Sequence, residues 1–117
     1  MSIQQTESFI RPTRSLTGRV AIVSGAGAAG DGIGNGRASA ILLAEAGCSV
    51  ICTDIQQDLA QRTVDMVEKD GKGKAIAVGA DATKEEDCRK AIKAAIEQFG
   101  RLDIRMNETS QRIDQHD

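Results

Sequence analysis

Short apolar runs alternate with longer amphipathic segments along most of the chain. The apolar runs have the length of buried strands and lie at residues 20–23, 48–54, 74–81 and 101–104. The amphipathic segments, in which apolar residues recur at helical spacing, lie at residues 35–46, 57–70 and 83–99. A glycine follows each of them, at Gly47, Gly71 and Gly100, as is typical of helix C-termini. The pattern predicts four strands that alternate with three helices.

The apolar positions of each predicted helix indicate which face is turned toward the core. In the first helix they are Ala38, Ile41, Leu42 and Ala46. In the second they are Leu59, Met66 and Val67. In the third they are Cys88, Ala91, Ile92, Ala95, Ile96 and Phe99. The third helix opens with a Thr-x-x-Glu capping box, Thr83 to Glu86, so we expect the Thr83 hydroxyl to cap it.

Strands that alternate with helices at this spacing are typical of a parallel sheet built from right-handed βαβ units. We predict an α/β fold, a Rossmann-like doubly wound parallel sheet, with the first two helices on one face and the third on the other. Residues 16–104 are expected to form this sheet. Residues 1–15 are predicted to be a flexible extension, and residues 105–117 a polar, disordered tail.

Composition and charge narrow the classes of partner. The 117 residues carry a net charge of −2, so nothing favours nucleic acid or an anionic membrane as a partner. No apolar run approaches the roughly 20 residues of a membrane span, and the N-terminus lacks the apolar core of a secretory signal. Three cysteines without a CxxC pair indicate buried thiols, and a single histidine excludes zinc sites built on several histidines. We expect a cytoplasmic location, with a mitochondrial presequence containing Arg11 and Arg14 as the weaker alternative.

Glycine is concentrated in one stretch, "IVSGAGAAGDGIGNGRA", between the first predicted strand and the first helix. Backbone N–H groups at such a junction favour an anion, and missing side chains let a diphosphate approach. A G-x-G-x-x-G register at Gly25 would run the helix through further glycines, and a Walker A register would put Asp31 where lysine is required. We favour a third register, in which Gly25 makes the turn and Gly32-Ile33-Gly34 opens the helix. A connecting loop without a ligand is the alternative.

Several motifs in the right order resemble the N-terminal half of a short-chain dehydrogenase/reductase. They are "LTGRVAIVSGAG", "GIGNGRA", "GCSVICTD", "GADAT" and "FGRLDI", and the resemblance covers Leu16 to Ile104. The glycine loop is longer than the T-G-x-x-x-G-x-G of that family, and Ser24 replaces its threonine. The resemblance implies an oxidoreductase that moves hydride between a nicotinamide cofactor and an alcohol or carbonyl substrate. It also implies that full-length relatives are homo-oligomers.

The resemblance further implies which residues bind the cofactor. Asp54 corresponds to the acid that binds the adenosine ribose, which favours NAD over NADP because a carboxylate repels a 2′-phosphate. Asp81 and Ala82 correspond to the pair that contacts adenine. Arg37 is the nearest candidate for an opposing NADP signal, and we interpret it as a surface charge. The complete set is Gly25, Gly32, Ile33, Gly34, Asp54, Asp81 and Ala82.

The chain also departs from the family after Ile104, and the resemblance therefore implies that the sheet is incomplete, with an open edge after its fourth strand. "RMNETSQRIDQHD" replaces the expected strand and its Asn-Asn-Ala-Gly motif, and Arg105 stands where a buried strand requires an aliphatic residue. Asn107 matches the motif by position only and receives no role. The sequence contains no tyrosine, so the Tyr-x-x-x-Lys acid–base pair of the family is absent. The catalytic serine of the family is absent too. We therefore assign no catalytic residue.

Two function classes stay open on this sequence. In the first, the chain is the cofactor-binding portion of an oxidoreductase and is inactive as it stands. In the second, it is a stand-alone nucleotide-binding or regulatory module without chemistry. For residues 105–117 we hypothesise a translated intron. A CGT codon for Arg105 followed by the ATG of Met106 would resemble a splice donor. An alternative C-terminus or a frameshift is equally compatible with the sequence.

Overall fold

The computed structural model describes residues 15–27, 34–71 and 73–107. Within these ranges strands and helices alternate, as the apolar pattern predicts. The elements in chain order are β1 (Val20–Ser24), α2 (Asn35–Glu45), β2 (Ser49–Asp54), α3 (Gln57–Asp70), β3 (Lys74–Gly79), α4 (Glu85–Phe99) and β4 (Ile104–Asn107). In the same ranges, no helix has the length and apolar character needed to cross a membrane.

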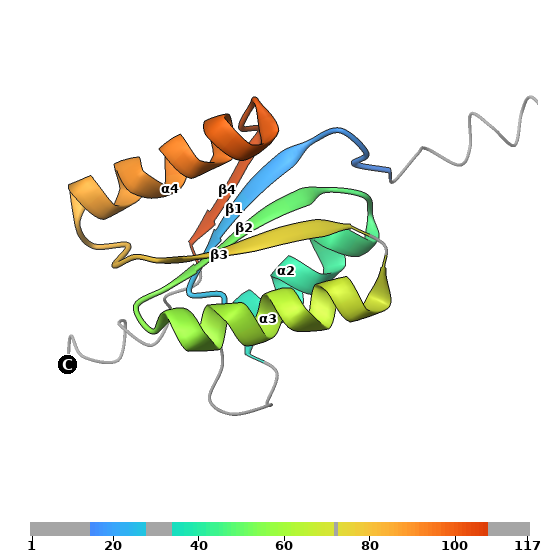
Figure 1. Cartoon of the computed structure of the whole chain (residues 1–117), viewed down its shortest axis with the longest axis horizontal. Coiled ribbons are helices and arrows are strands. Elements are labelled where there is room, and N and C mark those ends of the chain that lie inside the picture. The colour runs from blue at the N-terminus through green and yellow to red at the C-terminus, as the bar shows by residue number, and fades with distance from the viewer. Residues whose placement is uncertain (1–14, 28–33, 72, 108–117) are drawn as a thin grey trace, which may run out of the picture.

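The four strands form one parallel sheet in the order β3-β2-β1-β4. The chain moves outward from β1 to β3 and then returns to the other side of β1. Helices α2 and α3 therefore cover one face of the sheet and α4 covers the opposite face (Figure 1). The predicted Rossmann-like, doubly wound sheet is confirmed, together with the predicted assignment of helices to faces.

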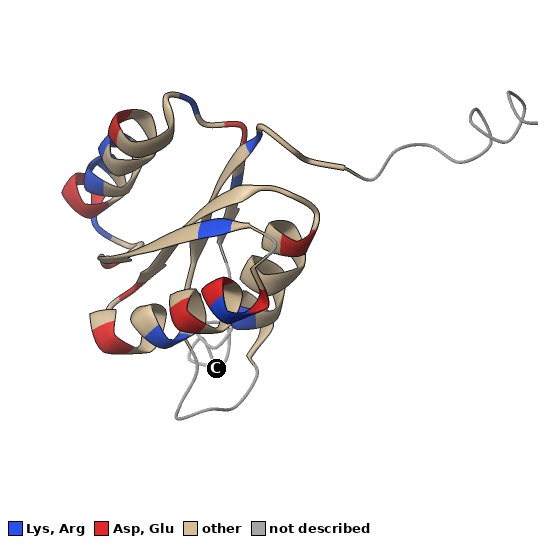
Figure 2. Cartoon of the chain, turned by 45° about the vertical axis from the view of Figure 1, so that its right-hand side comes forward, with Lys and Arg blue, Asp and Glu red and all other residues tan. Residues whose placement is uncertain are grey.

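Charged side chains lie mainly on the helices. Figure 2 shows acidic and basic residues mixed along α3 and α4, whereas the strands are largely uncharged. On α4, two ion pairs one helical turn apart join Glu85 to Arg89 (2.8 Å) and Lys93 to Glu97 (3.9 Å). All four side chains are exposed, so these pairs add little stability and keep the outer face of the helix soluble.

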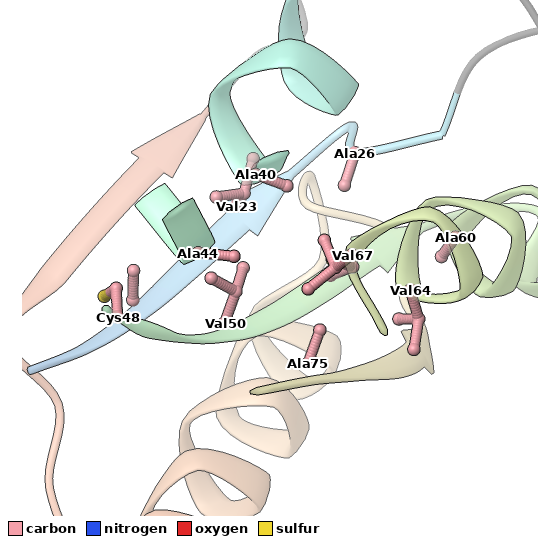
Figure 3. Close-up of a cluster of buried hydrophobic side chains, with 12 residues drawn as sticks. Val23, Ala26, Ala40, Ala44, Cys48, Val50, Ala60, Val64, Val67 and Ala75 are labelled. Atoms are coloured by element: carbon pink, nitrogen blue, oxygen red, sulfur yellow. The ribbon is translucent and has the colours of Figure 1, made fainter. Parts of the chain in front are cut away.

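The core is divided between the two faces of the sheet. Alternation along β1 turns Ala21 and Val23 toward α2 and α3, and it turns Val20 and Ile22 toward α4. Figure 3 shows the larger cluster, in which Val23 lies with side chains of β2, α2 and α3. Because both faces are covered, β1 and β2 read as continuous apolar runs.

The buried face of α2 differs from the predicted one. Its buried residues are Gly36, Arg37, Ala40 and Ala44, whereas the side chain of Leu42 is 65% exposed. Three of these residues are small and recur at every fourth position, which places them on one side of the helix. Small side chains let α2 lie close against the sheet, and this close packing outweighs the greater hydrophobicity of the predicted face.

Helices α3 and α4 follow the predicted bounds closely, and both end at glycines in the left-handed region, Gly71 (φ 74°) and Gly100 (φ 82°). Val67 is buried as expected, while Leu59 and Met66 are half-buried beside the inner residues of α3. On α4, Ala91 and Ala95 are buried, but Ile96 is 49% exposed. The face predicted for α4 is therefore correct except at Ile96, since Phe99 of the last turn is packed against the core.

The predicted capping box of α4 is wrong. The helix begins after Lys84, whose side chain makes no capping hydrogen bond. The Thr83 hydroxyl instead donates to Asp81 Oδ1 at 2.6 Å, and the Thr83 N–H donates to the same oxygen at 2.9 Å. A short acidic side chain two residues upstream competes successfully for a threonine in this way, so Thr83 belongs to the turn and not to the helix.

Strand β4 extends three residues past the predicted change of pattern at Ile104. Arg105 and Met106 pair in parallel with Ile22 and Val23 of β1. Arg105 is exposed rather than buried, because β4 is the edge strand, and this removes the predicted cost of a buried charge. The predicted disorder of the tail and the N-terminal extension concerns residues that, except for 15 and 105–107, lie outside the described ranges.

Candidate functional site

The candidate site lies at the edge of the sheet where β1, β2 and β3 end. Parallel strands bring their carboxyl ends to the same edge, so the three segments that lead into helices meet there. Two backbone hydrogen bonds join them. The Ala26 N–H donates to the Thr53 carbonyl and the Ala80 N–H donates to the Asp54 carbonyl, each at 2.9 Å. The three segments therefore form one continuous surface.

The turn after β1 requires glycine for reasons of packing. Gly25 has a φ of 70°, in the left-handed region. A Cβ atom on Gly36, in the first turn of α2, would collide with the Gly25 carbonyl oxygen. A Cβ atom on Gly27 would lie 2.6 Å from Leu59 Cβ of α3 and 3.0 Å from Asp54 Oδ2. These glycines let both helices approach the turn.

The N-terminus of α2 points its first backbone N–H groups toward this edge without a side-chain cap. Gly34 precedes the helix in an extended conformation (φ −94°), and the first turn contains no acidic residue. Free N–H groups and the positive end of the helix dipole favour an anion at this position. Gly32 and Ile33, also expected to bind the cofactor, lie outside the described residues.

Asp54 is the last residue of β2 and is half-buried. Its Oδ2 accepts a hydrogen bond from the Gly27 N–H at 3.0 Å, and its Oδ1 accepts one from the Gln56 N–H at 3.0 Å. The carboxylate thus joins the glycine turn to the start of α3. A carboxylate has about four lone-pair positions, so further donors can still be accepted.

Asp81 and Ala82 lie in the segment between β3 and α4. Asp81 accepts the two hydrogen bonds from Thr83 described above, and its own N–H donates to Asp87 Oδ2 at 2.8 Å. The Ala82 carbonyl accepts a hydrogen bond from the Cys88 thiol, with Sγ 3.4 Å from the oxygen. These interactions hold the segment against the start of α4, and the hydrogen bond from the Ala80 N–H to the Asp54 carbonyl brings Asp81 and Ala82 to the same edge as Asp54.

Arg37 contradicts the prediction of a surface charge. Its side chain is 0% exposed, and its Nε donates to Thr63 Oγ1 at 2.9 Å while its Nη2 donates to the Leu59 carbonyl at 3.3 Å. Thr63 is also fully buried, and its hydroxyl lies 2.8 Å from the Ala26 carbonyl. Charge alone predicts exposure, but the spacing of Gly36 and the small residues after it indicates that Arg37 lies on the inner side.

A pocket of about 260 Å³ adjoins this edge on the α4 side of the sheet. Ser24 and Thr53 line it from the ends of β1 and β2, Cys88 and Ala91 line it from α4, and Arg105 lines it from β4. Its volume is below the range usual for pockets that enclose a drug-sized ligand. Ala82, one of the predicted cofactor-binding residues, also lines it, so the pocket adjoins the candidate site directly.

Cys48 and Cys52 are buried and are not suited to nucleophilic chemistry. Burial raises the pKa of the Cys52 thiol to about 12 and also raises the pKa of Cys48, so both stay protonated near neutral pH. Within the described ranges, no three His, Cys, Asp or Glu side chains group as metal ligands do. The turn at Gly25, the N-terminus of α2 and the Asp54 carboxylate are together suited to binding an anionic, hydroxyl-bearing ligand.

Comparison with known proteins gives consistent matches. A family model described as enoyl-(acyl carrier protein) reductase matches residues 27–112. A cyclohexanol dehydrogenase of Acinetobacter sp. (strain SE19) is 36% identical over 95 residues, which are 81% of this chain and 36% of that protein. The crystal structure of a hydroxysteroid dehydrogenase from Escherichia coli matches with a TM-score of 0.74 at 38% identity, over 81% of this chain and 38% of that one.

A 7α-hydroxysteroid dehydrogenase solved with NADH and 7-oxo glycochenodeoxycholic acid matches with a TM-score of 0.71 at 38% identity. That match covers 80% of this chain and 34% of the other. The chain therefore spans about a third of the length of the relatives that it matches.

Proposed function

Because the chain belongs to the short-chain dehydrogenase/reductase family, we propose that it binds the adenosine diphosphate part of NAD. The activity that this binding would serve is hydride transfer between the nicotinamide and an alcohol or carbonyl substrate. The chain covers the first strands and helices of the sheet, so its own contribution is to bind and orient the cofactor.

The observation that carries this proposal is the position of Asp54 at the end of β2. Its two oxygens accept one backbone N–H each, from Gly27 and Gln56, which leaves lone pairs for the two ribose hydroxyls of NAD. A 2′-phosphate at that place would bring like charges together. The carboxylate therefore favours NAD over NADP.

The neighbouring groups suit the rest of the adenosine diphosphate. The uncapped N-terminus of α2 and the turn at Gly25 would hold the diphosphate, with Gly32, Ile33 and Gly34 supplying backbone N–H groups. Asp81 and Ala82 would contact adenine, with the Asp81 carboxylate accepting from the amino group. The bound NAD would supply the hydride acceptor, and these residues would fix its position relative to the sheet.

Calorimetric titration of the chain with NAD and with NADP tests the proposal. Replacing Asp54 with Asn removes the charge while keeping the shape, so NAD should bind about 10- to 100-fold more weakly because hydrogen bonds to charged groups contribute roughly 1.5–3 kcal/mol. The affinity for NADP should stay the same or increase. Asp65→Asn, which removes an exposed acid of α3, is the matched control and should change neither affinity. A parent chain that prefers NADP, or an Asp54→Asn variant that binds NAD unchanged, would contradict the assignment.

A further inference from the structure

A chain of hydrogen bonds begins at the buried Arg37 and ends at the half-buried carboxylate of Asp54. Arg37 Nε donates to Thr63 Oγ1 at 2.9 Å, and the Thr63 hydroxyl donates to the Ala26 carbonyl at 2.8 Å. The Gly27 N–H belongs to the same peptide group as the Ala26 carbonyl. This N–H donates to Asp54 Oδ2 at 3.0 Å. Helices α2 and α3, the turn after β1 and the end of β2 all contribute to this chain.

In the peptide group between Ala26 and Gly27, the direction of the carbonyl fixes the direction of the N–H. In a trans peptide the C=O and N–H bonds lie in one plane and point in opposite directions. No cis peptide occurs among the described residues. When Thr63 holds the Ala26 carbonyl inward, toward α3, the Gly27 N–H must point the other way, toward Asp54. The hydroxyl of Thr63 thereby sets the direction of a donor that it does not touch.

Arg37 decides which acceptor the Thr63 hydroxyl uses. Thr63 Oγ1 lies near two carbonyl oxygens, that of Ala26 at 2.8 Å and that of Leu59 at 3.5 Å. Arg37 Nη2 donates to the Leu59 carbonyl, and Arg37 Nε donates to Thr63 Oγ1 itself. The guanidinium therefore satisfies the competing acceptor and directs the single hydroxyl proton to Ala26.

We propose that Arg37 and Thr63 are positioning residues for Asp54, acting through the peptide group between Ala26 and Gly27. The proposal rests on the proposed function, in which Asp54 receives the ribose hydroxyls of NAD. It explains why a charged side chain is fully buried in α2, where an apolar residue of similar volume is often at least as stabilising. Orientation of the ribose-binding carboxylate is what the arginine adds.

Amide hydrogen exchange of the unliganded chain, followed by NMR, tests the positioning directly. Thr63→Val keeps the shape and removes the hydroxyl, whereas Thr63→Ser keeps the hydroxyl. The Gly27 amide should exchange about tenfold faster in Thr63→Val than in the parent or in Thr63→Ser, because its hydrogen bond is weakened. The Ala80 N–H, which donates to the Asp54 backbone carbonyl, is the internal control and should keep its rate. Unchanged exchange at Gly27, or equal acceleration at both amides, would overturn the proposal.

Arg37→Met tests the first step of the chain. Gly27 should again exchange faster, and the double variant with Thr63→Val should exchange no faster than Thr63→Val alone, since both changes break one chain. If the two substitutions accelerated exchange of the Gly27 amide additively, the proposal that both residues act through one chain of hydrogen bonds would be overturned. If Thr63→Val does not fold, Arg37→Met alone decides, because a Gly27 rate equal to that of the parent overturns the proposal.

Cofactor titration separates this proposal from the proposed function. In Thr63→Val the ratio of NAD affinity to NADP affinity should fall about tenfold, whereas a general loss of structure would lower both affinities together. A parent chain that binds neither dinucleotide would remove the proposed function and leave the exchange experiment to judge the hydrogen-bond chain. An unchanged affinity ratio in a variant with fast Gly27 exchange would overturn the link to Asp54.

Discussion

Replacing Gly36 with alanine tests how closely α2 packs on the glycine turn. Gly36 is buried in the first turn of the helix, directly against the Gly25 carbonyl. The added methyl group would collide with that oxygen, and it would also lie 2.7 Å from the Gly25 carbonyl carbon and 3.1 Å from Ala26 Cα. All three atoms belong to the backbone, so no side chain can rotate away.

Two effects of opposite sign set the magnitude. Overpacking in a core costs about 1–3 kcal/mol, and the upper value applies here because the obstructing atoms are backbone. Alanine is a better helix former than glycine by about 1 kcal/mol. The net expectation is a loss of about 2 kcal/mol in the free energy of unfolding, which for a domain of this size lowers Tm by roughly 8–16 °C.

Urea and thermal unfolding followed by circular dichroism measure this loss. Ser39→Ala, in the same helix, is the matched control, because it raises helix propensity without a collision and should alter the stability by less than about 0.7 kcal/mol. A Gly36→Ala variant as stable as the parent, or more stable, would refute the reasoning. It would mean that the contact between α2 and the turn does not require glycine at this position.

Two further predictions concern titrating groups. Because burial raises the pKa of the Cys52 thiol from its ordinary value of 9.0 to about 12, the unfolded chain loses this proton first, so the free energy of unfolding should fall as pH rises from 9 toward 12. Cys52→Ala should make that decline shallower in urea unfolding at several pH values, and an identical decline would contradict the assignment. Arg101 donates to both oxygens of Asp103 (2.9 and 2.7 Å) and holds the pKa of that carboxyl below its ordinary value of 3.8. Arg101→Met should raise that pKa in an NMR titration, and a pKa equal to that of the parent would contradict this.

Much of the site follows from strand order and strand ends, which the sequence states directly. Asp54 and Asp81 each come just after or at the end of an apolar run, so a parallel arrangement brings them to the same edge. The hydrogen bond from Ala80 to the Asp54 carbonyl bears this out. Asp54 also accepts from Gly27, so the acid and the glycine turn that the sequence places 27 residues apart are in direct contact.

The errors arise where residue type is a poor guide to environment. Leu42 is more hydrophobic than Ala40 or Gly36, yet it is exposed while the small residues are buried. Arg37 is charged, yet it is buried because Thr63 and Leu59 supply acceptors from another helix. Thr83 has the spacing of a helix cap, yet its hydroxyl donates to the Asp81 carboxylate and does not cap α4.

The sequence by itself determined the elements, their order and the sheet edge at which the candidate residues meet, because apolar periodicity and glycine-terminated helices are local properties of the chain. Only the tertiary structure decided which side of α2 is buried, which partner Thr83 takes and where the Arg37 guanidinium lies. These outcomes depend on how closely one element approaches another and on which acceptors that approach supplies. Such distances arise from packing between residues far apart in the chain, and the hydrophobicity of each residue does not give them.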